Sequence, residues 1–178
     1  KTPPPGVLQA CQEMGGGLDN VLCFHSLSKR SNVPGLRSGF AAGDSNLIDK
    51  LKTLRNYGGA AIPLPILNAS AALWRDEAHV EQNRELYRKK FNLADEILGK
   101  SFSYTRPGGG FYLWLNVGNG EQAASKLWSE AAVRIMPGKY LSKSDDNTNP
   151  GENYIRVALV QEPAFVSQSL TRIVNTLK

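Results

Sequence analysis

The chain lacks the features that mark secreted, membrane-spanning or metal-binding proteins. Its 178 residues contain only two cysteines, Cys11 and Cys23, at a spacing that suits no metal site. Cys23 stands in an apolar run, so we expect two buried thiols in the reducing cytoplasm rather than a disulfide. No stretch of 18 apolar residues and no signal-peptide pattern occur, which argues against a membrane span and against a secretion signal.

Concentrated charge is also missing. The formal net charge is +5, but no block of five or more lysines and arginines occurs. This predicts a weak preference for anions and no nucleic-acid partner. Neither G-x-x-x-x-G-K-[ST] nor a strand followed by G-x-G-x-x-G is present, which argues against a nucleotide-binding loop. Hydrophobic residues make up 41% of the chain, enough for a packed core.

One segment combines residue types that can react with an aldehyde and bind a phosphate. Ser26-Leu27-Ser28-Lys29 follows the apolar run of residues 21–24, and Arg37 stands eight residues after the lysine in a glycine-bearing turn. A lysine amine forms a Schiff base with an aldehyde, while hydroxyls and an arginine fork bind a phosphate. An aldehyde and a phosphate on one small molecule describe pyridoxal 5'-phosphate (PLP). Taken alone, Ser-x-Ser-Lys would more often be a surface segment; the preceding strand and the spaced arginine favour a cofactor site.

The same segment resembles the PLP-lysine signature of class I/II (fold-type I) aminotransferases. The longer run of residues 25–44 is most similar to the succinyldiaminopimelate aminotransferase branch. Three further motifs follow in the family's order: Pro-Gly-Gly-Gly-Phe-Tyr-Leu-Trp at 107–114, Met-Pro-Gly at 136–138 and Tyr-Ile-Arg-Val-Ala at 154–158. The resemblance therefore covers nearly the whole chain. It implies transfer of an amino group between an amino acid and a 2-oxo acid, with succinyldiaminopimelate and glutamate as the pair, in lysine biosynthesis.

The resemblance also implies roles for single residues. Lys29 would hold PLP through a Schiff base and move a proton on the bound substrate, which is general acid–base work. Arg37 and Ser26 would bind the phosphate, with Ser28 as a weaker candidate. Arg156 would grip the substrate α-carboxylate through its planar fork; the alternative is a surface arginine on an edge strand.

Two further segments complete the expected site. Gly109, Gly110 and Phe111 would line the substrate side; otherwise they form a turn and a core aromatic. Residues 57–63 resemble the stretch that borders the active site across a homodimer interface, although a plain linker between helices explains them nearly as well. His25 is interpreted as structural, and His79 has no role that the sequence supports.

The family's architecture predicts an α/β fold in three parts. Residues 1–65 would end the PLP-binding large domain, 66–99 would form one long interdomain helix, and 100–178 would form a small α/β domain. In the long helix, the charged residues 75–90 would be solvated, with Leu86, Tyr87 and Phe91 turned inward. Residues 142–151 should form a mobile surface loop. We expect helices at 7–14, 46–57, 66–98, 121–132 and 163–177, and strands at 21–24, 38–43, 111–117, 133–136 and 154–160.

The start of the chain predicts a missing part. No methionine opens the sequence, and the family's residues for the pyridinium nitrogen and ring oxygen would precede Lys1. We therefore expect the C-terminal part, roughly half, of a longer enzyme, inactive and weak in PLP binding when made alone. Another class I aminotransferase, a β-lyase, or the aminotransferase-like effector domain of a transcription regulator remain alternatives.

Overall fold

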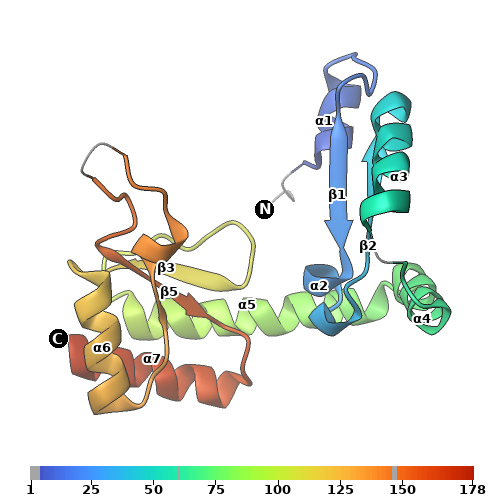
Figure 1. Ribbon diagram of the computed structural model, residues 1–178. Coiled ribbons are helices and arrows are strands. Elements are labelled where there is room, and N and C mark those ends of the chain that lie inside the picture. Colours follow the sequence, from blue (N-terminus) through green and yellow to red (C-terminus); the bar gives the residue numbers. More distant parts are fainter. Residues whose placement is uncertain (1–4, 60, 146–147) are drawn as a thin grey trace. The chain divides into compact units, whose positions relative to one another are not determined.

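The protein has the α/β architecture that the sequence predicts (Figure 1). The computed structural model describes residues 5–59, 61–145 and 148–178. Contacts within the chain divide it into two compact units, residues 1–83 and 84–178. The division falls inside helix α5 (Ala78–Leu98). The three-part division at residues 65 and 99 stays a prediction.

The first unit is built on an antiparallel hairpin of two strands. Strand β1 pairs with β2 in a register that begins at Leu22↔Gly43 and ends at Ser26↔Gly39. The chain between these strands forms two short helical turns, α2 and η1, which contact each other at one end of the hairpin (Figure 1). The elements of this unit are α1 (Val7–Glu13), β1 (Leu22–Ser26), α2 (Leu27–Arg30), η1 (Pro34–Leu36), β2 (Gly39–Gly43), α3 (Ser45–Gly58), α4 (Leu64–Arg75) and the start of α5.

The two ends of strand β2 require glycine. A Cβ atom on Gly39 would strike the carbonyl oxygen of His25, and one on Gly43 would strike that of Val21. Gly43 also has a φ of 143°, a conformation that side chains disfavour. Asp44 follows and caps α3, because its Oδ1 accepts hydrogen bonds from the backbone N–H groups of residues 46 and 47 at 2.8 and 3.2 Å.

Strand β1 is less buried than its apolar sequence suggests. Phe24 is 67% exposed, and no residue of β1 is fully buried. A two-stranded sheet has few neighbours to cover its faces, so an apolar run can form a strand without being enclosed. The apolar pattern indicated the strand correctly but not its environment.

The single long helix predicted for residues 66–98 is wrong. The structure has two helices, α4 and α5, separated by residues 76 and 77, and Asp76 is extended with φ −99° and ψ 116°. The Asp76 carboxylate accepts a hydrogen bond from the Ala78 backbone N–H at 2.8 Å. Aspartate favours such local bonds to its own backbone over a continued helix, so the chain turns here although neither glycine nor proline is present.

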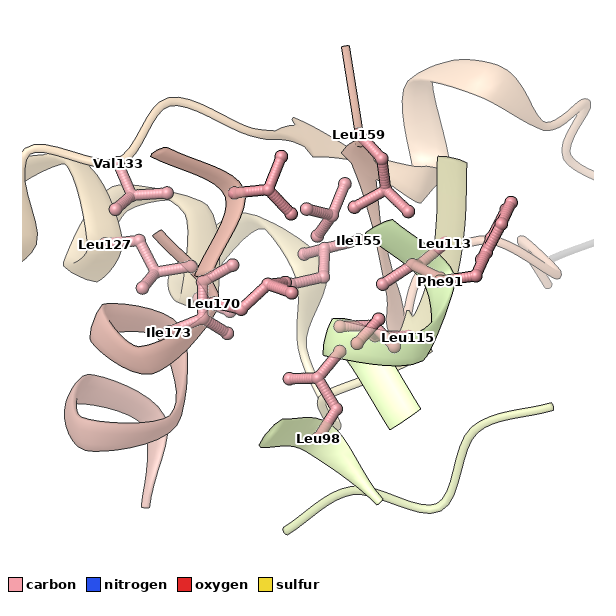
Figure 2. Close-up of a cluster of buried hydrophobic side chains, with 14 residues drawn as sticks. Phe91, Leu98, Leu113, Leu115, Leu127, Val133, Ile155, Leu159, Leu170 and Ile173 are labelled. Carbon is pink, nitrogen blue, oxygen red and sulfur yellow. The ribbon is translucent and has the colours of Figure 1, made fainter. Parts of the chain in front are cut away.

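The second unit is a small sheet covered by helices. Its strands lie in the order β3–β5–β4, all antiparallel. Alternate residues of β3 and β5 face a core that also receives side chains from α5, α6 and α7; Figure 2 shows these side chains converging. The elements are the rest of α5, β3 (Tyr112–Asn116), α6 (Gly120–Ala131), β4 (Met136–Pro137), η2 (Gly138–Leu141), β5 (Tyr154–Ala158) and α7 (Pro163–Leu177).

Three details of this unit correct the expectations. Strand β4 begins at Met136 rather than at residue 133, and Val133 before it packs into the core at 8% exposure. Leu86 is 41% exposed, whereas Phe91 is buried as predicted. Lys90 is only 6% exposed, so the charged face of α5 is not solvated throughout.

The remaining expectations concern thiols, loops and special sites. Cys11 and Cys23 are free thiols and only partly buried. The loop expected at 142–151 includes residues 146 and 147, which lie outside the described residues; on either side of them Asp145 and Thr148 form an antiparallel bridge. In the part of the chain that the structure describes, no helix is long and apolar enough to cross a membrane. The same residues contain no group of three or more histidine, cysteine, aspartate or glutamate side chains that could hold a metal.

Candidate functional site

The turn that carries Lys29 begins with a serine cap. Ser26 ends β1 in an extended conformation, and its Oγ accepts a hydrogen bond from the Ser28 backbone N–H at 3.1 Å. The same hydroxyl donates to the Ser38 carbonyl oxygen at 3.4 Å. Leu27 is fully buried beneath the turn, whereas Lys29 is exposed. The chain thus buries the leucine and presents the lysine on one turn of helix.

Arg37 occupies the other end of this connection. Its backbone is left-handed, with φ 50° and ψ 36°, a conformation that non-glycine residues adopt rarely and that recurs at functional sites. Its Nη1 donates to the Pro34 carbonyl oxygen at 2.9 Å, and the residue is exposed. Because α2 and η1 contact each other, the turns that carry Lys29 and Arg37 are neighbours.

Helix α4 supports this connection through two buried hydroxyls. The Oγ atoms of Ser38 and Ser70 lie 2.8 Å apart, and the two residues are 6% and 4% exposed. Three rings of β1, β2 and α4 also pack together: the centre of the His25 ring lies 5.6 Å from that of Phe40 and 5.3 Å from that of Trp74. His25 therefore joins β1 to β2 and α4, which agrees with a structural interpretation.

The junction between α4 and α5 contacts the two residues after Lys29. The Arg30 guanidinium donates to the Leu73 carbonyl oxygen at 2.8 Å and pairs with Glu77. The buried Ser31 hydroxyl lies 2.8 Å from Nε2 of His79, whose Nδ1 lies 2.8 Å from the Asp76 carboxylate. This hydrogen bond from His79 is the main reason that the pKa of Asp76 is lowered.

Arg156 lies in the second unit, on the central strand of its sheet. It pairs in register with Trp114 of β3 and Met136 of β4. Its neighbours Ile155 and Val157 are buried in the core, so strand alternation turns Arg156 to the opposite face. There the half-buried guanidinium lies 5.6 Å from the centre of the Tyr112 ring. Arg156 is thus a central-strand residue, unlike the edge-strand surface arginine of the alternative interpretation.

Several aromatic rings of the second unit pack in pairs on strands β3 and β5 and on the residues before β3. The Trp114 ring stacks on Tyr154 at 5.5 Å, and it lies so close to Gly138 that a Cβ there would strike it. Phe111 is partly buried, with its ring 6.5 Å from that of Tyr87 and 5.3 Å from that of Tyr112. Gly110 before it has a φ of 100°, which only glycine adopts readily.

Four of the predicted site residues lie together in the first unit, and the other three lie in the second unit. Ser26, Ser28, Lys29 and Arg37 share one connection of the first unit, whereas Gly110, Phe111 and Arg156 belong to the second. For residues 57–63, Tyr57 is 90% exposed near the end of α3, and residue 60 lies outside the described residues.

Sequence reasoning missed the residues that hold the lysine turn in place. Arg30, Ser31 and Ser38 stand in the run of residues 25–44 without a role assigned to them, and Ser70 and His79 belong to no motif. The available signal was weak: small polar residues beside a lysine motif, and a histidine three residues after an aspartate, are common on surfaces. Only the arrangement of α4 and α5 around α2 indicates their positions.

Comparisons with known proteins identify the family of this chain. Residues 6–172 match the family described as aminotransferase class I and II. The chain is 32% identical over 160 residues to the 4-dedimethylamino-4-oxo-anhydrotetracycline transaminase OxyQ of Streptomyces rimosus, covering 89% of this chain and 43% of that protein. An LL-diaminopimelate aminotransferase of Dehalococcoides mccartyi is 30% identical over 168 residues, covering 92% of this chain and 42% of its own.

A solved structure shows the same fold. The crystal structure of an aminotransferase from Neisseria meningitidis superposes with a TM-score of 0.92 at 43% sequence identity, covering 98% of this chain and 45% of that one. The chain therefore spans less than half the length of the relatives that it matches.

Proposed function

Because this chain belongs to the class I and II aminotransferase family, we propose that it supplies the cofactor lysine and the carboxylate-binding arginine of a PLP-dependent transaminase. Members of this family use PLP. The observation that carries the proposal is the connection between β1 and β2, which presents Lys29 and Arg37 on two contacting turns. When bound, PLP supplies an aldehyde for an amine and a ring that withdraws electrons from the substrate Cα.

The groups on this connection fit a phosphorylated aldehyde. Lys29 offers the amine, Arg37 offers a fixed fork of donors for phosphate oxygens, and Ser28 adds a hydroxyl beside them. Ser26 fits less simply, because its Oγ already accepts from the Ser28 N–H and donates to the Ser38 carbonyl. We assign Ser26 a capping role in addition to any contact with phosphate.

The chain's own residues would then act as follows. The Lys29 Nζ would bind the aldehyde carbon and, once displaced by the substrate amine, carry a proton to and from the substrate Cα. Arg156 would orient the substrate through its α-carboxylate with two parallel N–H···O bonds. Gly110 and Phe111 would border the bound amino acid, with the glycine leaving room for it.

The proposed substrates are based on the names of relatives and on the motif at residues 25–44. We propose a diaminopimelate-type amino acid, succinylated or not, with glutamate as the second substrate, in lysine biosynthesis. The similarity of residues 25–44 to the succinyldiaminopimelate branch and the LL-diaminopimelate relatives support this class. A cytoplasmic homodimer, in which residues 57–63 border the site of the partner copy, completes the proposal.

The test uses a hybrid in which this chain replaces the equivalent 45% of the Neisseria meningitidis aminotransferase. After incubation with PLP and reduction by borohydride, peptide mapping should find the pyridoxyl group on Lys29. Lys29→Ala should abolish transamination, whereas Lys50→Ala, an exposed lysine on α3, should not. A pyridoxyl group on another lysine would refute the assignment.

Two arginine variants test which arginine binds the phosphate of PLP and which binds the carboxylate of the substrate. Arg37→Ala should weaken retention of PLP, because the phosphate loses a charge-assisted bidentate contact. Arg156→Ala should raise KM for every amino acid and 2-oxo acid while PLP stays bound. Loss of PLP from Arg156→Ala with unchanged KM would show that the two roles are reversed.

A further inference from the structure

Arg30, the residue after Lys29, is anchored more firmly than a surface arginine. Its side chain is only 11% exposed. The guanidinium donates to the carbonyl oxygens of Leu73 and Asp76, at 2.8 and 3.5 Å, and it pairs with the Glu77 carboxylate. It also lies 5.0 Å from the centre of the Trp74 ring, within range of a cation–π contact.

The next residue is held at the same place. Ser31 is 6% exposed, and its hydroxyl lies 2.8 Å from Nε2 of His79. His79 in turn contacts the Asp76 carboxylate through Nδ1 at 2.8 Å. Both residues that follow Lys29 are therefore bound to residues 73–79, the junction where α4 ends and α5 begins.

Such an anchor matters because α2 cannot hold itself in place. The helix has four residues, Leu27–Arg30, and therefore about one turn. A single turn fixes several dihedral angles for very few hydrogen bonds and is unfavourable in isolation. The buried Leu27 fixes the start of the turn, so the side on which Lys29 emerges depends on what holds Arg30.

Arginine is the residue type that this anchor requires. A planar guanidinium can donate to a carbonyl oxygen and a carboxylate at once while its face lies on an indole ring, whereas a lysine ammonium is a compact charge without a flat face. Arg30→Lys therefore keeps the charge and the pairing with Glu77 but loses the geometry.

We propose that Arg30 is a positioning residue: its contacts with Leu73, Trp74 and Glu77 fix the turn that carries Lys29 in the orientation needed for bond formation and proton transfer. This inference rests on the proposed function, in which Lys29 is the cofactor lysine. In this proposal Arg30 acts through the turn that carries Lys29 and not by contact with cofactor or substrate. A misplacement of about 1 Å at a reacting group can cost on the order of a hundredfold in rate, so the anchor sets the reactivity of its neighbour.

The test compares Arg30→Lys with Arg75→Lys, an exposed arginine at the end of α4. Glu77→Gln, which keeps the shape of the side chain but removes its charge, is the second anchor variant. Three experiments are made: hydrogen exchange of residues 27–31 in this chain without cofactor, the rate of borohydride trapping of PLP on Lys29 in the Neisseria hybrid, and steady-state transamination kinetics that give kcat and KM.

For Arg30→Lys we expect faster exchange at residues 27–31, trapping slowed about tenfold or more, and a lower kcat with KM changed less than about twofold. Glu77→Gln should change the same quantities in the same direction, and Arg75→Lys should match the unaltered protein. If Arg30→Lys lowers the unfolding temperature but traps PLP at the original rate, the residue is merely structural and the proposal is wrong.

Failure of the proposed function gives a different result. If the unaltered hybrid does not trap PLP on Lys29, the transaminase assignment fails, and the positioning role fails with it. If the unaltered hybrid traps PLP normally and Arg30→Lys does so too, only the positioning role is refuted. Exchange at residues 27–31 that is equal in Arg30→Lys and Arg75→Lys would refute the anchor itself.

Discussion

The buried pair Ser38 and Ser70 allows an asymmetric prediction. A serine hydroxyl has one proton, and the Ser70 Oγ lies 2.6 Å from the Ile66 carbonyl oxygen, which can only accept. The proton of Ser70 is therefore used there, and Ser38 must be the donor across the 2.8 Å between the two Oγ atoms. The two substitutions by alanine therefore differ: Ser70→Ala removes the acceptor of this hydrogen bond, and Ser38→Ala removes its donor.

Ser70→Ala leaves the buried Ser38 O–H without its acceptor. An unsatisfied buried donor costs about 1–3 kcal/mol, and the better helix propensity of alanine offsets about 0.5 kcal/mol of this. Ser38→Ala removes the donor instead, while Ser70 still donates to Ile66, so only the net value of one neutral hydrogen bond is lost, about 0.5–1.5 kcal/mol. We expect Ser70→Ala to be the more destabilising variant.

The assay is urea unfolding followed by the fluorescence of Trp74, which lies on α4. The other two tryptophans, Trp114 and Trp128, are replaced by phenylalanine so that the signal reports the first unit alone. In the double variant both hydroxyls are gone, so the combined loss should be smaller than the sum of the single losses. A larger loss for Ser38→Ala than for Ser70→Ala, or additive losses, would refute the assigned direction of the hydrogen bond.

Two predictions concern the second unit. Leu170→Ala, at a fully buried position of α7, should lower the free energy of unfolding by about 3–4 kcal/mol. Phe165→Ala, at a position 62% exposed on the same helix, should change it by about 0.5 kcal/mol or less. If calorimetry finds equal effects for the two variants, the assignment of Leu170 to the core is wrong. Burial lowers the pKa of Lys90, while the charge of Glu162 opposes this shift; Lys90→Met should therefore raise stability at pH 7 by on the order of 1 kcal/mol. The unfolded chain binds the Lys90 proton more tightly, so the unaltered protein should regain this stability as the pH rises through the lowered pKa toward 10.5, and the gain from Lys90→Met should shrink over that range. If the stability gain from Lys90→Met stays constant with pH, burial of the charged Lys90 is not its cause.

Local patterns in the sequence predicted most elements of the fold. The apolar runs and cap signals indicated β1, β2, α3, β3, α6, β5 and α7 close to their observed bounds. These elements depend on contacts between near neighbours, such as the Asp44 cap, or on an alternation that repeats over several residues. The break at Asp76 was missed because the helical spacing of apolar residues continues across it, while one aspartate side chain decides the local geometry.

The sequence by itself determined which residues are the candidates for the chemistry, because Lys29, Arg37 and Arg156 stand in motifs that follow one another in the order of the family that the chain resembles. It could not determine what holds them. The anchor of Arg30 on residues 73–77 and the contact of Ser31 with His79 join positions more than 40 residues apart in sequence. Only the packing of α4 and α5 against α2 decides such contacts, since a buried hydrogen bond depends on where its partner lies in space and leaves no periodic signal along the chain.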